Sequence, residues 1–106
     1  MVGLNLFFNG RQNMKIHELK IHPEALEAQE LGFKNFELRK HDREFQIGDI
    51  LRLSEYEFDT CEYTGVSLLV VITYILQDNI AGNGNIHGLQ EGYSILGTEH
   101  LKTAHP

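Results

Sequence analysis

GFKNFELRKHDREFQIGD, residues 32–49, is the stretch from which we predict the fold. It begins with Gly32, which can end a preceding helix because a residue without Cβ enters the left-handed conformation at little cost. From Lys34 to Lys40 apolar and polar residues then alternate, which is the period of a strand with one buried face. Phe36 and Leu38 share one face, whereas Asn35, Glu37 and Arg39 share the other. We therefore expect a half-buried strand at residues 34–40, directly after a helix.

The polar face of this strand brings a carboxylate and a guanidinium side by side. Arg39 offers a rigid fork of donors and Glu37 offers only acceptors, so the pair could read a nucleobase edge, a phosphate or an amide. The pair could also be a surface ion pair, which contributes little to stability. Strict alternation places Lys34 on the opposite face, so a twist or bulge near Gly32 would be needed to bring all three side chains together.

The segments around this stretch predict further strands and one helix. Residues 14–21 alternate as a short strand, and Pro23 suits the first turn of a helix that runs to Leu31. The side chains expected to face the core from this helix are Ala25, Leu26, Ala28 and Leu31. Later strands are expected at residues 50–53, 66–76 and 91–96, with the acidic segment 55–62 and the loop 77–88 between them.

The apolar composition of residues 66–76 predicts that this strand is the most buried one, because large apolar residues occupy both of its faces. The loop at 77–88 could be a lid or a variable connection. We expect a leader or flexible extension at residues 1–13, a domain at 14–97 and a C-terminal tail at 98–106.

Composition limits the classes of function. The chain has 106 residues, a length that suits one domain, and no apolar run long enough to span a membrane. Its formal net charge of -6 argues against indiscriminate binding of nucleic acid. Residues 34–43 nevertheless carry four basic residues against two acidic ones, a net charge of +2 that suits a short or single-nucleotide ligand. With the single Cys61, these features predict a cytoplasmic protein without disulfides, which we expect to be a monomer.

Residues 32–39 match the Gly-x-Lys-x-x-Glu-x-Arg motif of ASCH domains, which are small members of the PUA-like superfamily. The similarity extends over about residues 14–97, and this part of the chain resembles a small bacterial and phage subfamily of ASCH-like domains. The further matching segments are His17–Pro23, Phe45–Leu51, Tyr63–Gly65 and Glu91–Tyr93. This resemblance implies an α+β fold: a PUA-like mixed β-barrel of about five or six strands with one or two helices. It also implies a cleft lined by the motif and an association with RNA binding or nucleotide-related chemistry.

The motif and the basic segment supply the candidate site residues. We expect Lys34 and Arg39 to engage phosphate or base acceptors, Glu37 to accept from base amino groups, and Lys40 and Arg43 to add positive charge. Among the aromatic residues Tyr56, Tyr63 and Tyr93, which could stack on bases, Tyr93 is the preferred candidate. The ligand is thus expected to be RNA or a nucleotide-like molecule, and the sequence predicts neither a cofactor nor a metal, since the spacing of the six histidines resembles no zinc motif.

An enzyme is the alternative that the resemblance leaves open. The superfamily includes acetylcytidine amidohydrolases, whose proposed catalytic set combines the motif lysine with a threonine three residues later and a distant glutamate. Here Lys34 matches the lysine, but Glu37 stands where that family has threonine, which puts the same mechanism in doubt. The carboxylate of Glu37 could instead serve as a general base to a water in amide hydrolysis. Glu91 could be the distant acid. A third possibility is a protein-interaction module whose cleft binds no small ligand.

Overall fold

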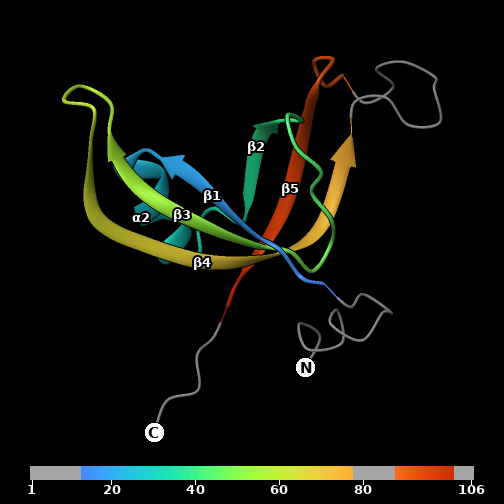
Figure 1. The fold of residues 1–106 in the computed structure, drawn as a ribbon, viewed down its shortest axis with the longest axis horizontal. Helices are drawn as coiled ribbons and strands as arrows, with labels where there is room; N and C mark the ends of the chain where they lie inside the picture. The colour runs from blue at the N-terminus through green and yellow to red at the C-terminus, as the bar shows by residue number, and fades with distance from the viewer. Residues whose placement is uncertain (1–12, 78–87, 102–106) are drawn as a thin grey trace, which may run out of the picture.

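The computed structural model describes residues 13–77 and 88–101, which form one strongly curved sheet and a short helix (Figure 1). The elements are β1 (Ile16–Ile21), α2 (Pro23–Glu30), β2 (Phe36–Lys40), β3 (Ile50–Glu57), β4 (Glu62–Gln77) and β5 (Tyr93–His100). The strand order is β1-β3-β4-β5-β2, and β1 pairs with β3 in parallel while the other pairs are antiparallel. The described part of the chain is thus a five-stranded mixed half-barrel, which confirms the prediction of a small barrel-like α+β fold.

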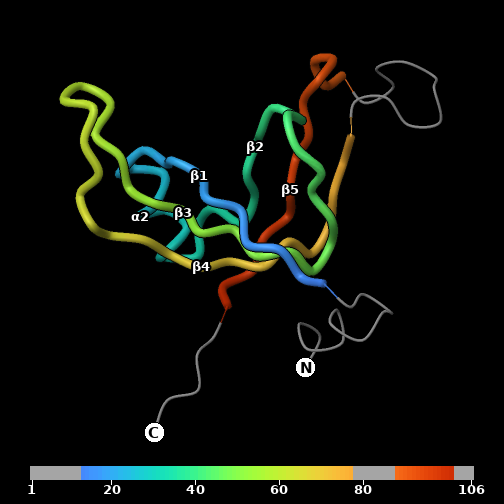
Figure 2. The backbone as a smooth tube through the Cα atoms, in the orientation of Figure 1, coloured from blue at the N-terminus to red at the C-terminus, as the bar shows by residue number. Residues whose placement is uncertain are grey.

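Helix α2 connects the two edge strands, β1 and β2 (Figure 2). Pro23 occupies its first turn, and Gly32 ends it with a φ of +82°. The backbone carbonyl of Ala28 accepts hydrogen bonds from the amides of the two residues that follow this glycine. The expected end of the helix at Gly32 is therefore confirmed, with the left-handed turn that only glycine adopts cheaply.

The predicted core face of α2 is partly wrong. Leu26 is buried and Ala25 packs beside it, but Leu31 is 60% exposed because the helix ends at Glu30 and the chain turns away. Gln29 is buried instead, with 1% of its surface exposed. A polar side chain of the helix is thus buried, whereas the prediction placed only apolar side chains of this helix in the core.

The hydrophobic core lies between α2 and the concave face of the sheet. In β1 the buried residues are His17, Leu19 and Ile21, as the alternation predicted. Leu26 of the helix packs against this face. Its partners from the other strands include Leu51, Leu53, Val70, Ile72 and Leu96.

Strand β4 is buried only in its middle. Val70, Val71 and Ile72 are buried, whereas Val66 and Tyr74 are exposed, so the prediction that residues 66–76 form the most buried strand holds only for this middle part. β3 pairs with the first part of β4, up to Val71, and β5 pairs with the second part, from Val70. Only the residues near Val70 therefore have a neighbouring strand on both sides. Each end of β4 pairs with one strand alone, which leaves residues at both ends accessible to water.

The segment 55–62, which was expected to connect two strands, belongs largely to the strands themselves. β3 continues to Glu57 and β4 begins at Glu62, so that the two strands form a hairpin that projects from the sheet (Figure 1). A tight turn joins them, in which Cys61 has a φ of 59°. At the other end of the chain, β5 continues to His100 past the expected strand end, since Thr98 donates its amide to the carbonyl of Asn35.

The motif strand β2 alternates as predicted, but its apolar face is the exposed one. Phe36 and Leu38 are 44% and 54% exposed, while Glu37 is buried. The pairing with β5 explains this result, because Glu37 lies opposite the buried Leu96 and Arg39 opposite the buried Ser94. The polar pair of the motif therefore points into the half-barrel.

Several expectations lie outside the described residues. These are the predictions for residues 1–12 of the leader, for the loop at 78–87 and for residues 102–106 of the tail. Among the residues that are described, no helix has the length and apolar character required to cross a bilayer.

Candidate ligand-binding site

The carboxylate of Glu37 is the centre of the motif cluster, and donors from three side chains surround it. Its Oε2 atom accepts from Gln29 Nε2 at 2.9 Å and from Lys34 Nζ at 2.5 Å. Its Oε1 atom accepts from Arg39 through Nη2 at 2.9 Å and Nε at 3.2 Å. A carboxylate has about four lone-pair sites, so these four contacts occupy its accepting capacity.

Lys34 reaches this cluster from the turn that precedes β2, not from the strand. The left-handed Gly32 redirects the chain, and the ammonium then donates to the carbonyl of Phe36 at 2.7 Å as well as to Glu37. The irregularity that strict alternation required near Gly32 is therefore a helix-ending turn. It brings Lys34, Glu37 and Arg39 together.

Arg39 also links the two edges of the curved sheet. Its Nη2 atom donates to the backbone carbonyl of Lys20 at 2.8 Å, so a side chain of edge strand β2 contacts the backbone of edge strand β1. Arg39 thus joins two strands that share no backbone ladder. A guanidinium suits this position because its fixed fork donates to two acceptors at once.

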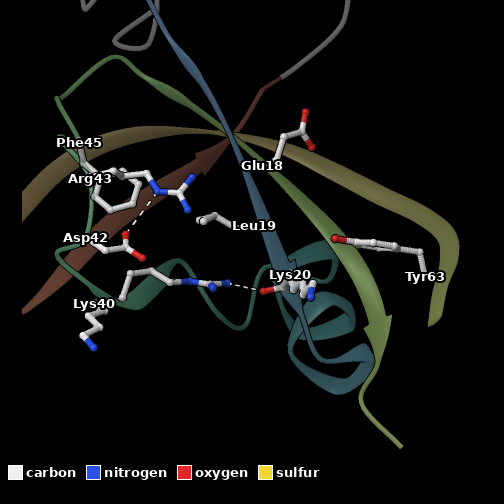
Figure 3. A pocket seen from close by; sticks show the side chains of 9 residues that line it. Glu18, Leu19, Lys20, Lys40, Asp42, Arg43, Phe45 and Tyr63 are labelled. Atoms are coloured by element: carbon white, nitrogen blue, oxygen red, sulfur yellow. Dashed lines mark hydrogen bonds and ion pairs between the residues drawn. The ribbon is translucent and has the colours of Figure 1, made fainter. Parts of the chain in front are cut away.

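Two open pockets adjoin this link, since both include Lys20 and Arg39 in their walls. The first, called here the loop pocket, has a volume of about 330 Å³ and is lined further by Glu18, Leu19, Lys40, Asp42, Arg43, Phe45 and Tyr63 (Figure 3). The second, called here the helix pocket, has a volume of about 350 Å³. Its other lining residues are Ile21, His22, Ala25, Lys34, Phe36, Glu37, Leu38 and Phe58. Both volumes fall at the small end of the range for ligand sites, which suits a small ligand.

The remaining predicted site residues differ in their placement. Arg43 extends into the loop pocket, where it pairs with Asp42 at 3.4 Å and lies over the ring of Phe45 (Figure 3). Lys40 lines the same pocket, but its amino group points away from the other side chains drawn. Tyr93 lies opposite Lys40 in the β2–β5 pair, and the described lining of the two pockets does not include it.

Three residues of this site escaped the sequence-based prediction. Gln29 Nε2 donates to the Glu37 carboxylate from helix α2, and Gln29 Oε1 accepts from Thr98 Oγ1 at 3.4 Å. Its position, one turn after Leu26, was a weak signal of burial that its polarity obscured. Lys20 and Phe58 come from β1 and the β3–β4 turn, and no local pattern connects either of them with the motif.

Comparison with known families places most of the chain in one family. The chain belongs to the family described as a domain of unknown function, DUF3850, whose model matches residues 16–98. The match begins with β1 and ends within β5, so it includes all the residues of the motif cluster and both pockets. A comparison with curated proteins finds no match. Across the described ranges, no three histidine, cysteine or acidic side chains form a group that could hold a metal ion.

Proposed function

We propose that this domain binds RNA, a nucleotide or a modified nucleobase at the two pockets beside the motif. The observation that carries this proposal is the position of Lys34 and Arg39, which Glu37 holds at the wall of open pockets. Both cations have donors beyond those that contact Glu37, since an ammonium has three and a guanidinium five. Anionic or carbonyl groups of a ligand are the acceptors that such donors recognise.

The charges around the loop pocket favour an anionic ligand. Four cations line it, Lys20, Arg39, Lys40 and Arg43, against the two carboxylates Glu18 and Asp42. The chain as a whole has a net charge of -6, which disfavours a long duplex with many phosphates. A short ligand that contacts only this local patch fits both facts.

The role of Glu37 in this proposal is to position the two cations. The sequence suggested that it accepts from base amino groups, but four donors of the chain already contact its oxygens. Direct contact with a ligand is therefore assigned to Lys34 and Arg39.

The half-barrel and the motif also support membership in the PUA-like superfamily and its ASCH branch, which we include in the proposal.

An amide chemical-shift titration with a mixed-sequence oligoribonucleotide at low salt tests this function. We expect shifts concentrated at residues 32–43 and an affinity that falls at least tenfold in Arg39→Ala. The matched control is Lys15→Ala, which removes one positive charge from an exposed residue outside both pockets. No shifts at millimolar ligand, or equal losses in the two variants, would refute the proposal.

A small amidohydrolase acting on an acylated nucleoside is the second candidate. The direct contact between Lys34 Nζ and Glu37 Oε2 favours it, because a lysine and a carboxylate in contact could share a proton during amide hydrolysis. The four donors around Glu37 weigh against a general base at this carboxylate. Turnover of an acetylated cytidine that is lost in Lys34→Ala would establish the enzyme; absence of both binding and turnover would favour a protein-interaction module.

A further inference from the structure

Four aromatic rings form a continuous series of contacts at the surface beside the two pockets. The ring of His22 stacks on Phe58 with centroids 4.2 Å apart, and Phe58 meets Tyr56 edge to face at 4.9 Å. Tyr56 in turn meets Tyr63 at 4.9 Å. We call these four residues the aromatic ladder. Phe58 and Tyr63 remain 46% and 59% exposed, so ring surface is still available for a ligand.

The aromatic ladder connects the helix pocket with the loop pocket. Phe58 and His22 belong to the wall of the helix pocket, whereas Tyr63 belongs to the wall of the loop pocket. Figure 3 shows Tyr63 on the far side of the loop pocket from Arg43. Each pocket therefore has exposed aromatic surface, from Phe36 and Phe58 in the helix pocket and from Tyr63 in the loop pocket. Each also has cations that the other lacks, Lys34 in the helix pocket and Lys40 and Arg43 in the loop pocket.

Cations also occupy the junction between the pockets. Lys20 Nζ lies 4.2 Å from the ring centroid of Tyr56 and 5.9 Å from that of Tyr63, and Lys20 lines both pockets. Arg39 lines both as well, and it donates to the Lys20 carbonyl. Positive charge at the junction, with a ring on either side, is the arrangement that a phosphate between two bases would require.

Stabilisation of the hairpin explains only part of this arrangement. Tyr56 and Tyr63 lie directly opposite each other in the β3–β4 pair, and such cross-strand contacts between aromatic rings stabilise a hairpin. Phe58, however, lies in the turn, beyond the last residue pair of β3 and β4. Nearly half of its surface is still exposed at the wall of the helix pocket. Its exposure calls for a second explanation.

We propose that the two pockets bind two consecutive nucleotides of a single-stranded nucleic acid. One base stacks on Phe58 in the helix pocket, the next stacks on Tyr63 in the loop pocket, and the phosphate between them contacts Lys20 and Arg39. This inference rests on the proposed function and narrows the ligand from a nucleotide to a single strand. A duplex is excluded because its paired and stacked bases expose no faces to side-chain rings.

Binding of adenosine monophosphate and of the dinucleotide ApA, each measured by isothermal titration calorimetry, tests this inference. We expect ApA to bind at least tenfold more tightly than the mononucleotide. Stacking contributes about 1–3 kcal/mol per base, so Phe58→Leu and Tyr63→Leu should each weaken ApA binding by about fivefold or more. The matched control is Tyr74→Leu, which removes a ring on β4 that is at least as exposed as Phe58 and Tyr63 and that neither pocket wall includes among the described residues.

Two further ligands complete the design. The deoxy dinucleotide dApdA distinguishes RNA from DNA, and an eight-base-pair RNA duplex should bind more weakly than a single strand of the same sequence. The inference is overturned if ApA and the mononucleotide bind equally, if the two leucine variants bind like the Tyr74→Leu control, or if the duplex binds as well as the single strand. If Arg39→Ala weakens mononucleotide binding while ApA gains nothing, only this inference fails; if neither ligand binds, the proposed function fails with it.

Discussion

The replacement Glu37→Gln removes the charge around which the motif cluster is organised. The carboxylate is 3% exposed and accepts from Gln29, Lys34 and Arg39. Glutamine keeps one acceptor oxygen but directs an NH₂ group at side chains that themselves donate. Removing one partner of a buried ion pair costs about 3–5 kcal/mol. The side chains of Lys34 and Arg39 are each 22% exposed and can regain part of their hydration, so we expect a loss at the low end, about 3 kcal/mol.

Urea denaturation followed by circular dichroism measures this loss. With a slope of roughly 1.5 kcal/mol per molar urea, a loss of about 3 kcal/mol lowers the midpoint by about 2 M. The matched control is Glu57→Gln at an exposed position of β3, where the same chemical change should cost less than about 0.5 kcal/mol. A loss in Glu37→Gln no larger than that in the control would refute the argument that Glu37 neutralises the two cations.

Three other replacements test separate parts of the fold, each by the same denaturation assay. Gly32→Ala should cost about 1 kcal/mol because of its φ of +82°, and Gly32→Asn should cost less, since nothing lies within 4 Å of an added Cβ and asparagine tolerates the left-handed region better. Asp49→Ala should cost about 3 kcal/mol, because the buried carboxylate accepts from His17 and from two backbone amides. Leu53→Ala should also cost about 3 kcal/mol through the cavity that it leaves, whereas the exposed Val66→Ala should cost less than about 1 kcal/mol. A cost below about 0.5 kcal/mol for Gly32→Ala, Asp49→Ala or Leu53→Ala would contradict the backbone or burial argument behind that variant.

The candidate site was predictable where its chemistry is local. Lys34, Glu37 and Arg39 lie within six residues of one another. Their residue types alone also fitted a surface ion pair and an ordinary exposed lysine, and it was the resemblance to the ASCH motif that grouped the three as candidate ligand contacts. The sequence did not show that Gln29 would donate to Glu37, because the polarity of glutamine obscured the weak signal of burial that its position one turn after Leu26 gave. Nor did it place Lys20 and Phe58 at the pockets, since both reach them through the curvature of the sheet.

Local sequence patterns predicted the order of the helix and strands and the alternation within β1 and β2, but not the full lengths of β3, β4 and β5. Gly32 ended the helix because of its backbone freedom, and period-two patterns set the two faces of β1 and β2. Which face of β2 lies inside depends on tertiary contacts, because alternation distinguishes two faces without indicating which one the neighbouring elements cover. The pairing of Glu37 with Leu96 and of Arg39 with Ser94 turned the polar face inward. The curvature that brings β1 and β2 within reach of the Arg39 side chain depends on contacts among all five strands, which no local segment of the sequence encodes.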